Sequence, residues 1–253
     1  MAGFADGALT VAREAGELSD LDERWATAEL ERIRTLAKTE LGRLPANSAD
    51  QVLSEFLFTR LGFVREVTDT SLRFVLLPGV LRQRRGSCVG LSSLLLAVAE
   101  ALGRSANGVL MPGHFYVRLG EHGSTRNVEL LRQGEAMSNA WYTGRFPIAG
   151  GGAARYARAL GANESLGVIE YDVGKERRRQ LRLEEARGAF ARSVRLFPQF
   201  AEAHASLGAT LHLLGRLDDA ARSYHAARTL DPLLPGVDWN IELLERELAF
   251  AVR

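Results

Sequence analysis

The sequence predicts an α+β domain followed by an all-helical domain, and three observations lead to this fold class. Apolar residues recur at helical spacing through most of the first hundred residues. Short runs rich in valine, phenylalanine and tyrosine follow, which is typical of β-strands. From about residue 167 the pattern repeats after 34 residues, as it does in stacked pairs of helices. A chain of 253 residues is long enough for two such domains.

Four helices are predicted in the first part of the chain, because apolar residues recur there at spacings of three and four. They are expected over residues 19–45, 47–63, 71–86 and 88–103. Ser19 caps the first, Pro78 interrupts the third, and Gly103 ends the fourth.

Two strands are predicted next, over residues 108–119 and 125–131, joined by a tight turn at Gly120–Gly123. Residues 144–155 are predicted to be a loop before the second domain. Their glycines do not form a dinucleotide-binding fingerprint, because Arg155 stands where a third glycine is required.

The second domain is predicted from small and large residues that recur after 34 positions. The matching pairs are Val173 and Leu207, Gly174 and Gly208, Ala186 and Ala220, Phe190 and Tyr224, and Pro198 and Pro232. This pattern resembles the tetratricopeptide repeat, in which such residues let the two helices of a pair nest together. Residues 236–253 are expected to form a last helix that covers the stack.

Composition excludes several classes of protein. A single cysteine excludes an intramolecular disulfide framework and any multi-cysteine zinc site. The N-terminal residues lack the pattern of a signal peptide, and no uncharged apolar run is long enough to span a membrane, so a cytoplasmic protein is predicted. The basic stretch 175–187 is interleaved with acids and has no aromatic residues, so no nucleic acid is expected as a partner. No metal and no cofactor are predicted.

The lone cysteine, Cys88, stands at the start of the apolar helix 88–103. It is either a small core residue or a nucleophile. The position favours a nucleophile, because the dipole and free N–H groups of a helix start stabilise a thiolate. Gln83, five positions earlier, is either a donor to an oxyanion or a polar residue on a helix end.

His114 is the second candidate, and the hairpin suggests its partner. With a four-residue turn at Gly120–Gly123, Leu119 pairs with Ser124 and His114 lies opposite Glu129, about 5 Å away at Cβ. Asn127 lies on the same face and is the alternative to Glu129 as the residue that orients the His114 ring. A nucleophile, a base and a carboxylate would form a Cys-His-acid triad.

From about residue 52 to residue 134 the chain resembles the SirB-type transglutaminase-like family, through "GSC" before a leucine-rich helix and through "PGHF". The resemblance implies a papain/transglutaminase-like core with N-terminal helices, followed by tetratricopeptide repeats. It implies Cys88 as the nucleophile, His114 as the base and Glu129 in the acid position, where the superfamily usually has Asp. The expected segments are an N-terminal helical segment (1–47), the core (48–148), a linker (149–166) and the repeats (167–253).

Two functions follow from these expectations. The first is a thiol enzyme that hydrolyses an amide or transfers an acyl group, with a peptide or protein substrate or partner held by the repeats. The alternative is a non-catalytic scaffold on the same fold, since many relatives in the SirB branch lack the cysteine.

Overall fold

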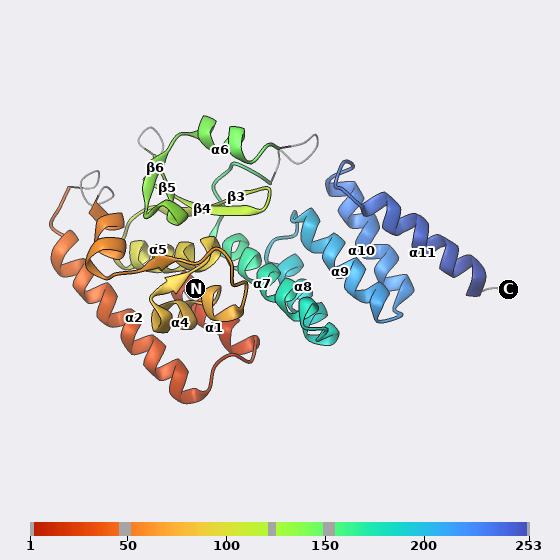
Figure 1. The fold of residues 1–253 in the computed structure, drawn as a ribbon, viewed down its shortest axis with the longest axis horizontal. Coiled ribbons are helices and arrows are strands. Elements are labelled where there is room, and N and C mark those ends of the chain that lie inside the picture. Colours follow the sequence, from red (N-terminus) through yellow and green to blue (C-terminus); the bar gives the residue numbers. More distant parts are fainter. Residues whose placement is uncertain (1–2, 46–51, 121–124, 149–154, 252–253) are drawn as a thin grey trace. The chain divides into compact units, whose positions relative to one another are not determined.

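The computed structural model describes residues 3–45, 52–120, 125–148 and 155–251 (Figure 1). The chain divides into two compact units. The first consists of Met1–Pro147 and Ala157–Ile169, and the second of Ile148–Tyr156 and Glu170–Arg253. No helix in the described ranges is long and apolar enough to cross a membrane.

Helices and short strands precede the main sheet of the first unit. They are α1 (Phe4–Glu14), α2 (Asp20–Leu41), the π-helical turn η1 (Phe56–Arg60), β1 (Val64–Arg65), the 3₁₀ turn η2 (Leu72–Phe74), α4 (Leu77–Gln83), β2 (Arg85–Gly86) and α5 (Cys88–Ala101). The predicted cap of α2 is confirmed, because the Ser19 side chain accepts a hydrogen bond from the Asp22 N–H. Of the helix predicted over 47–63, residues 47–51 lie outside the described ranges.

The prediction that Pro78 interrupts a helix is wrong. Pro78 lies in the first turn of α4, where its missing N–H removes no intrahelical hydrogen bond. The helix ends at Arg84, which adopts a left-handed conformation with φ 51°. The chain then enters β2, which pairs in parallel with β1, and reaches Cys88 directly afterwards.

α5 is the central helix of the first unit. Its residues from Val89 to Ala99 are all buried, and it packs against β3, β4, α1 and α4 (Figure 1). A helix that is apolar on every side is stable only inside a core. The first residue of this buried helix is Cys88, so the core holds the thiol at a defined place.

The main sheet is antiparallel, in the order β3 (Ala106–Met111), β4 (His114–Leu119), β5 (Arg126–Glu129) and β6 (Glu135–Met137). The prediction of a single strand over 108–119 is wrong. Pro112 and Gly113, with Gly113 at φ 69°, turn the chain between two strands in the middle of that range. The sheet also gains β6, which the sequence analysis did not predict.

The predicted hairpin register is wrong by two residues. Leu119 pairs with Arg126 and Val117 with Val128, so extending this register places Tyr116, rather than His114, opposite Glu129. The predicted turn residues 121–124 lie outside the described ranges. Because side chains alternate with a period of two, a shift of two leaves every residue on its predicted face.

The predicted loop over 144–155 begins with helical residues. α6 (Asn139–Arg145) starts at Ser138, whose side chain accepts a hydrogen bond from the Trp141 N–H. This serine cap is a local signal for a helix start that the sequence analysis overlooked. Residues 149–154 of the predicted loop lie outside the described ranges.

The second unit contains most of the C-terminal helices, which follow each other as α7 (Ala162–Arg179), α8 (Leu183–Leu196), α9 (Ala201–Leu213), α10 (Leu217–Leu230) and α11 (Val237–Ala251). Within this unit the Gly174 backbone approaches the Phe190 ring, and the Gly208 backbone approaches the Tyr224 ring. These two close contacts are 34 residues apart in the chain. They are compatible with the predicted repeat.

Substituting Gly208 with alanine is expected to destabilise the second unit. A Cβ atom at this position would lie 2.7 Å from Cδ1 of the buried Tyr224 ring, so α9 and α10 would have to separate. Such overpacking costs about 1–3 kcal/mol, offset in part by the higher helix propensity of alanine. The measurement is the urea midpoint of unfolding. Gly188→Ala on α8 is the control, because its Cβ would meet only Arg192 Nη1 at 3.5 Å, and a drop of equal size in that variant would contradict the packing explanation.

Candidate active site

Cys88 is the first residue of α5, and its side chain is half-buried. The preceding residue, Ser87, caps the helix by accepting a hydrogen bond from the Gly90 N–H at 3.2 Å. Gly90 also lets the helix start lie against Phe74, since a Cβ at this position would come within 2.2 Å of the Phe74 carbonyl oxygen. The backbone that carries the half-buried thiol is therefore held from two sides.

His114 is the first residue of β4, and its ring is hydrogen-bonded to Glu129 at the end of β5. The distance from Nε2 to Glu129 Oε2 is 2.7 Å, and the two side chains are 5% and 2% exposed. The pair is made diagonally across the two strands, rather than between directly opposed residues as predicted. The second carboxylate oxygen of Glu129 accepts a hydrogen bond from the Leu131 N–H at 3.0 Å.

The environment of His114 favours its charged form. Burial by itself would lower the pKa of the ring, but hydrogen bonds with Cys88 and Glu129 outweigh burial and raise the pKa from 6.5 to about 9. Because Glu129 bonds Nε2, the nitrogen left for Cys88 is Nδ1. The structure thus brings Cys88, His114 and Glu129 together in the order thiol, imidazole, carboxylate.

Three aromatic side chains from α6 and the residue after it surround the imidazole. The Phe146 ring stacks on the His114 ring with centroids 4.4 Å apart and an interplanar angle of 8°. Tyr142 lies 6.2 Å from His114 and stacks at 3.7 Å on Tyr116. Trp141 packs edge-on against both Tyr142 and Phe146. These contacts restrict the ring to one orientation and reduce the access of water to it.

Asn127 does not orient His114, so that part of the prediction is wrong. Its side chain accepts a hydrogen bond from Arg118 Nε at 2.8 Å and donates one to Asn139 Oδ1 at 2.7 Å. Asn139 is the first residue of α6. The physical reason is the shifted register, which pairs Asn127 with Arg118 and brings it to the start of α6. Asn127 therefore attaches α6 to the sheet.

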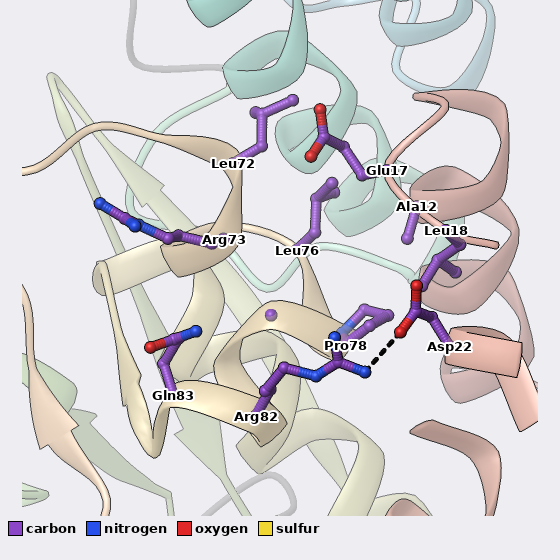
Figure 2. A pocket seen from close by; sticks show the side chains of 11 residues that line it. Ala12, Glu17, Leu18, Asp22, Leu72, Arg73, Leu76, Pro78, Arg82 and Gln83 are labelled. Atoms are coloured by element: carbon purple, nitrogen blue, oxygen red, sulfur yellow. Dashed lines mark hydrogen bonds and ion pairs between the residues drawn. The ribbon is translucent and has the colours of Figure 1, made fainter. Parts of the chain in front are cut away.

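Gln83 is exposed at the end of α4 and lines a pocket between α4, η2 and the N-terminal helices (Figure 2). Three charged residues of this pocket are engaged in ion pairs: Arg82 with Asp22, as the dashed line in Figure 2 marks, and Arg73 with Asp69 outside the pocket. Cys88, His114 and Glu129 are not among the lining residues. The role of Gln83 as an oxyanion donor stays a prediction.

A metal ion has no evident place in the described part of the chain. No group of three or more His, Cys, Asp or Glu side chains in these ranges is arranged to hold one.

In this unit a helix that begins at the half-buried Cys88 packs against the antiparallel sheet that carries the His114–Glu129 pair. Residues 24–148 match the family model described as "Transglutaminase-like superfamily". These residues form a transglutaminase-like domain. The match spans just under half of the chain, and it contains Cys88, the sheet and α6.

Comparison with other proteins adds little to the transglutaminase-like assignment. No curated protein matches the chain. Among solved structures, the chain is similar to a crystal structure of menin that is described as revealing the binding site for Mixed Lineage Leukemia (MLL) protein. The TM-score is 0.44 and the identity 10%, over 90% of this chain and 65% of the menin chain. This chain thus spans less than two thirds of the menin chain, and so weak a likeness carries no argument.

The sequence analysis missed the aromatic residues that cover the imidazole in the transglutaminase-like domain. Trp141, Tyr142 and Phe146 lie in or next to a segment for which only a loop, over residues 144–155, was predicted. A local signal was present, because "SNAWYTGRF" combines a serine cap with three aromatic residues in six positions.

Proposed function

We propose that the transglutaminase-like domain is a thiol enzyme that hydrolyses amides or transfers acyl groups, with Cys88 as nucleophile, His114 as base and Glu129 as the residue that orients and charges the ring. The observation that carries this proposal is the buried 2.7 Å contact between His114 and Glu129 beside the half-buried Cys88. An imidazole with a raised pKa next to a thiol is the arrangement that generates a thiolate nucleophile.

The first half of the reaction forms a thioester. In the reactive ion pair the Cys88 proton already resides on His114 Nδ1, and the thiolate sulfur attacks the carbonyl carbon of an amide. The new S–C bond forms a tetrahedral intermediate, which collapses as the C–N bond breaks. The imidazolium returns its proton to the departing amine nitrogen, and the acyl group remains on sulfur.

The second half releases the acyl group. His114 takes a proton from water or from an amine, whose oxygen or nitrogen attacks the thioester carbonyl. The tetrahedral intermediate collapses as the S–C bond breaks, the acyl product leaves, and the Cys88 thiolate beside the His114 imidazolium is restored. Throughout, the Nε2–H of the ring stays directed at Glu129, which stabilises the imidazolium whenever it forms.

Backbone N–H groups at the start of α5 are suited to stabilise the negative oxygen of the intermediate. The Gly90 N–H is engaged by the Ser87 side chain and the Leu91 N–H by the Ser87 carbonyl. The N–H groups of Cys88 and Val89 lie ahead of the first intrahelical bond and have no backbone acceptor among the described residues, so they are placed to donate to an oxyanion.

We also infer that the protein is of the SirB type and that its C-terminal helices are tetratricopeptide repeats that bind a peptide or protein. The close contacts of Gly174 with Phe190 and of Gly208 with Tyr224, at the expected separation, support the repeats. Paired helices of this kind stack into arrays with an extended binding surface.

The test of the enzyme proposal is acylation of the native protein by p-nitrophenyl acetate. We expect release of p-nitrophenol together with an acetyl adduct at Cys88 in the intact mass, and neither in Cys88→Ala. Addition of glycinamide separates the two reactions, since a transferase forms the acetyl amide and a hydrolase forms acetate. Equal release from the native protein and Cys88→Ala, without an adduct, would sink the proposal and favour the non-catalytic scaffold.

A further inference from the structure

Tyr142 is a buried polar group that the mechanism above does not use. Its side chain is 1% exposed, and its hydroxyl is buried without a hydrogen bond of ordinary geometry to any described residue. Burying a hydroxyl without a partner costs free energy of about 1–3 kcal/mol, so a buried hydroxyl without one requires an explanation.

The surroundings of Tyr142 place it beside Glu129. Its ring stacks at 3.7 Å on Tyr116, which the extended register sets across the strands from Glu129, and it lies 6.2 Å from the His114 ring that Glu129 holds. Glu129 is 2% exposed. A buried carboxylate has about four acceptor positions, and the hydrogen bonds described for Glu129 are those with His114 and the Leu131 N–H.

We propose that the Tyr142 hydroxyl donates a hydrogen bond to the Glu129 carboxylate and is a positioning residue for the catalytic pair, which sets how much negative charge Glu129 presents to His114. This inference rests on the proposed function only for its effect on catalysis. The coupling between the three side chains is a property of the fold and is measurable without any substrate.

The protonation state of Tyr142 suits this role. Burial, and next the neighbouring Glu129 carboxylate, raise the pKa of Tyr142, so the phenol keeps its proton and remains a donor. Tyr116 differs in having a partner, since its hydroxyl oxygen accepts a hydrogen bond from Arg118 Nη2 at 3.2 Å, whereas the Tyr142 hydroxyl has none of ordinary geometry among the described residues. The titratable and charged groups described around the imidazole are Cys88 from α5, Glu129 from β5, Tyr142 from α6, and Tyr116 with Arg118 from β4.

The consequence for His114 has a definite sign. A donor to Glu129 withdraws part of the carboxylate charge from the ring. Removing the Tyr142 hydroxyl leaves more negative charge on the Glu129 oxygen that faces Nε2. The His114 ring then holds its proton more strongly, and its pKa rises. The Tyr142→Phe variant retains the stacked ring and removes only the hydroxyl, so it isolates this effect from packing.

The experiment is an NMR titration of the His114 ring nitrogens in the full-length native protein, in Tyr142→Phe and in Tyr116→Phe. We expect the midpoint to rise by roughly half a pH unit in Tyr142→Phe and to stay in place in Tyr116→Phe. The alkylation of Cys88 by iodoacetamide, measured against pH, should shift in the same direction in Tyr142→Phe alone.

The inference is overturned if the titration of Tyr142→Phe superimposes on that of the native protein, or if Tyr116→Phe moves the midpoint equally. Circular dichroism and the unfolding midpoint establish that both variants are folded. If the His114 midpoint shifts in Tyr142→Phe but p-nitrophenyl acetate does not acetylate Cys88 in the native protein, the coupling is supported and the enzyme proposal is refuted. The failure of one proposal is therefore distinguishable from the failure of the other.

Discussion

Replacing His114 with alanine is expected to slow the alkylation of Cys88 by roughly 10- to 100-fold at about pH 6.5. In the native protein the ring is an imidazolium at this pH, because burial is outweighed by the bonds to Cys88 and Glu129 and the pKa is about 9. The positive charge stabilises a thiolate. Without it, the thiol lacks the positive neighbour that favours the reactive thiolate.

The measurement is the rate of iodoacetamide addition from about pH 5 to pH 10, followed by intact mass. The single cysteine makes each adduct unambiguous. His225→Ala is the matched control, because that ring is exposed on α10, and it should react like the native protein. Glu129→Gln retains a hydrogen-bond acceptor without the charge and should fall between native and His114→Ala. Equal rates in the native protein and His114→Ala at pH 6.5 would show that the two side chains are not coupled.

The same pair gives stability a pH dependence of known sign. The folded-state pKa of His114, about 9, lies above its ordinary value of 6.5, so the native state binds the proton more tightly than the unfolded state. The contribution of the His114 proton to the free energy of unfolding is fully present below about pH 6.5 and is lost as the pH rises through about 9. The difference in unfolding free energy between the native protein and His114→Ala should therefore shrink over this range.

Replacing Arg155 with methionine is expected to destabilise the second unit by about 3–5 kcal/mol. The Arg155 side chain is 4% exposed and bonds Glu202 through Nε at 2.8 Å. Its Nη2 bonds Asp231 at 2.8 Å, and Tyr156 is hydrogen-bonded to Glu202 in the same cluster. Removing the cation leaves two carboxylates at an apolar site without their partner, and this is the costly way to break a buried ion pair.

Urea unfolding and hydrogen exchange measure this effect. Exchange in α9 and α10 should rise in Arg155→Met, while exchange in α5 of the first unit stays unchanged. Arg158→Met is the control: its ion pair with Glu164 is partly exposed, at 33% and 27%, and is expected to contribute less than about 1 kcal/mol. Similar losses in both variants would contradict a special role for the Arg155 cluster.

Some of the site was predictable from the sequence because its determinants are local. The apolar run after Cys88 predicts α5, and Ser87 with Gly86 predicts its start. Strand alternation placed His114 and Glu129 on one face, and that relation survives a register error of two because the side-chain period is two. The catalytic roles of Cys88, His114 and Glu129 stay predictions.

Other features depend on contacts between distant residues. The sequence alone did not reveal that Tyr142 of α6 and Phe146 after it stack against the imidazole, because stacking is decided by the packing of a helix on a sheet. Nor did it assign Asn127 to the attachment of α6, since its partners follow from the register.

Spacing along the sequence was enough to predict α2 and α5, the position of Cys88 at a helix start, and the common face of His114 and Glu129. These properties depend on spacing within a few residues, where backbone geometry is the main constraint. Only the tertiary structure decided the hairpin register, the buried contact of His114 with Glu129, the aromatic cover and the Arg155 cluster. These features join residues far apart in the chain, and their free energy comes from burial and charge pairing that exist only after folding.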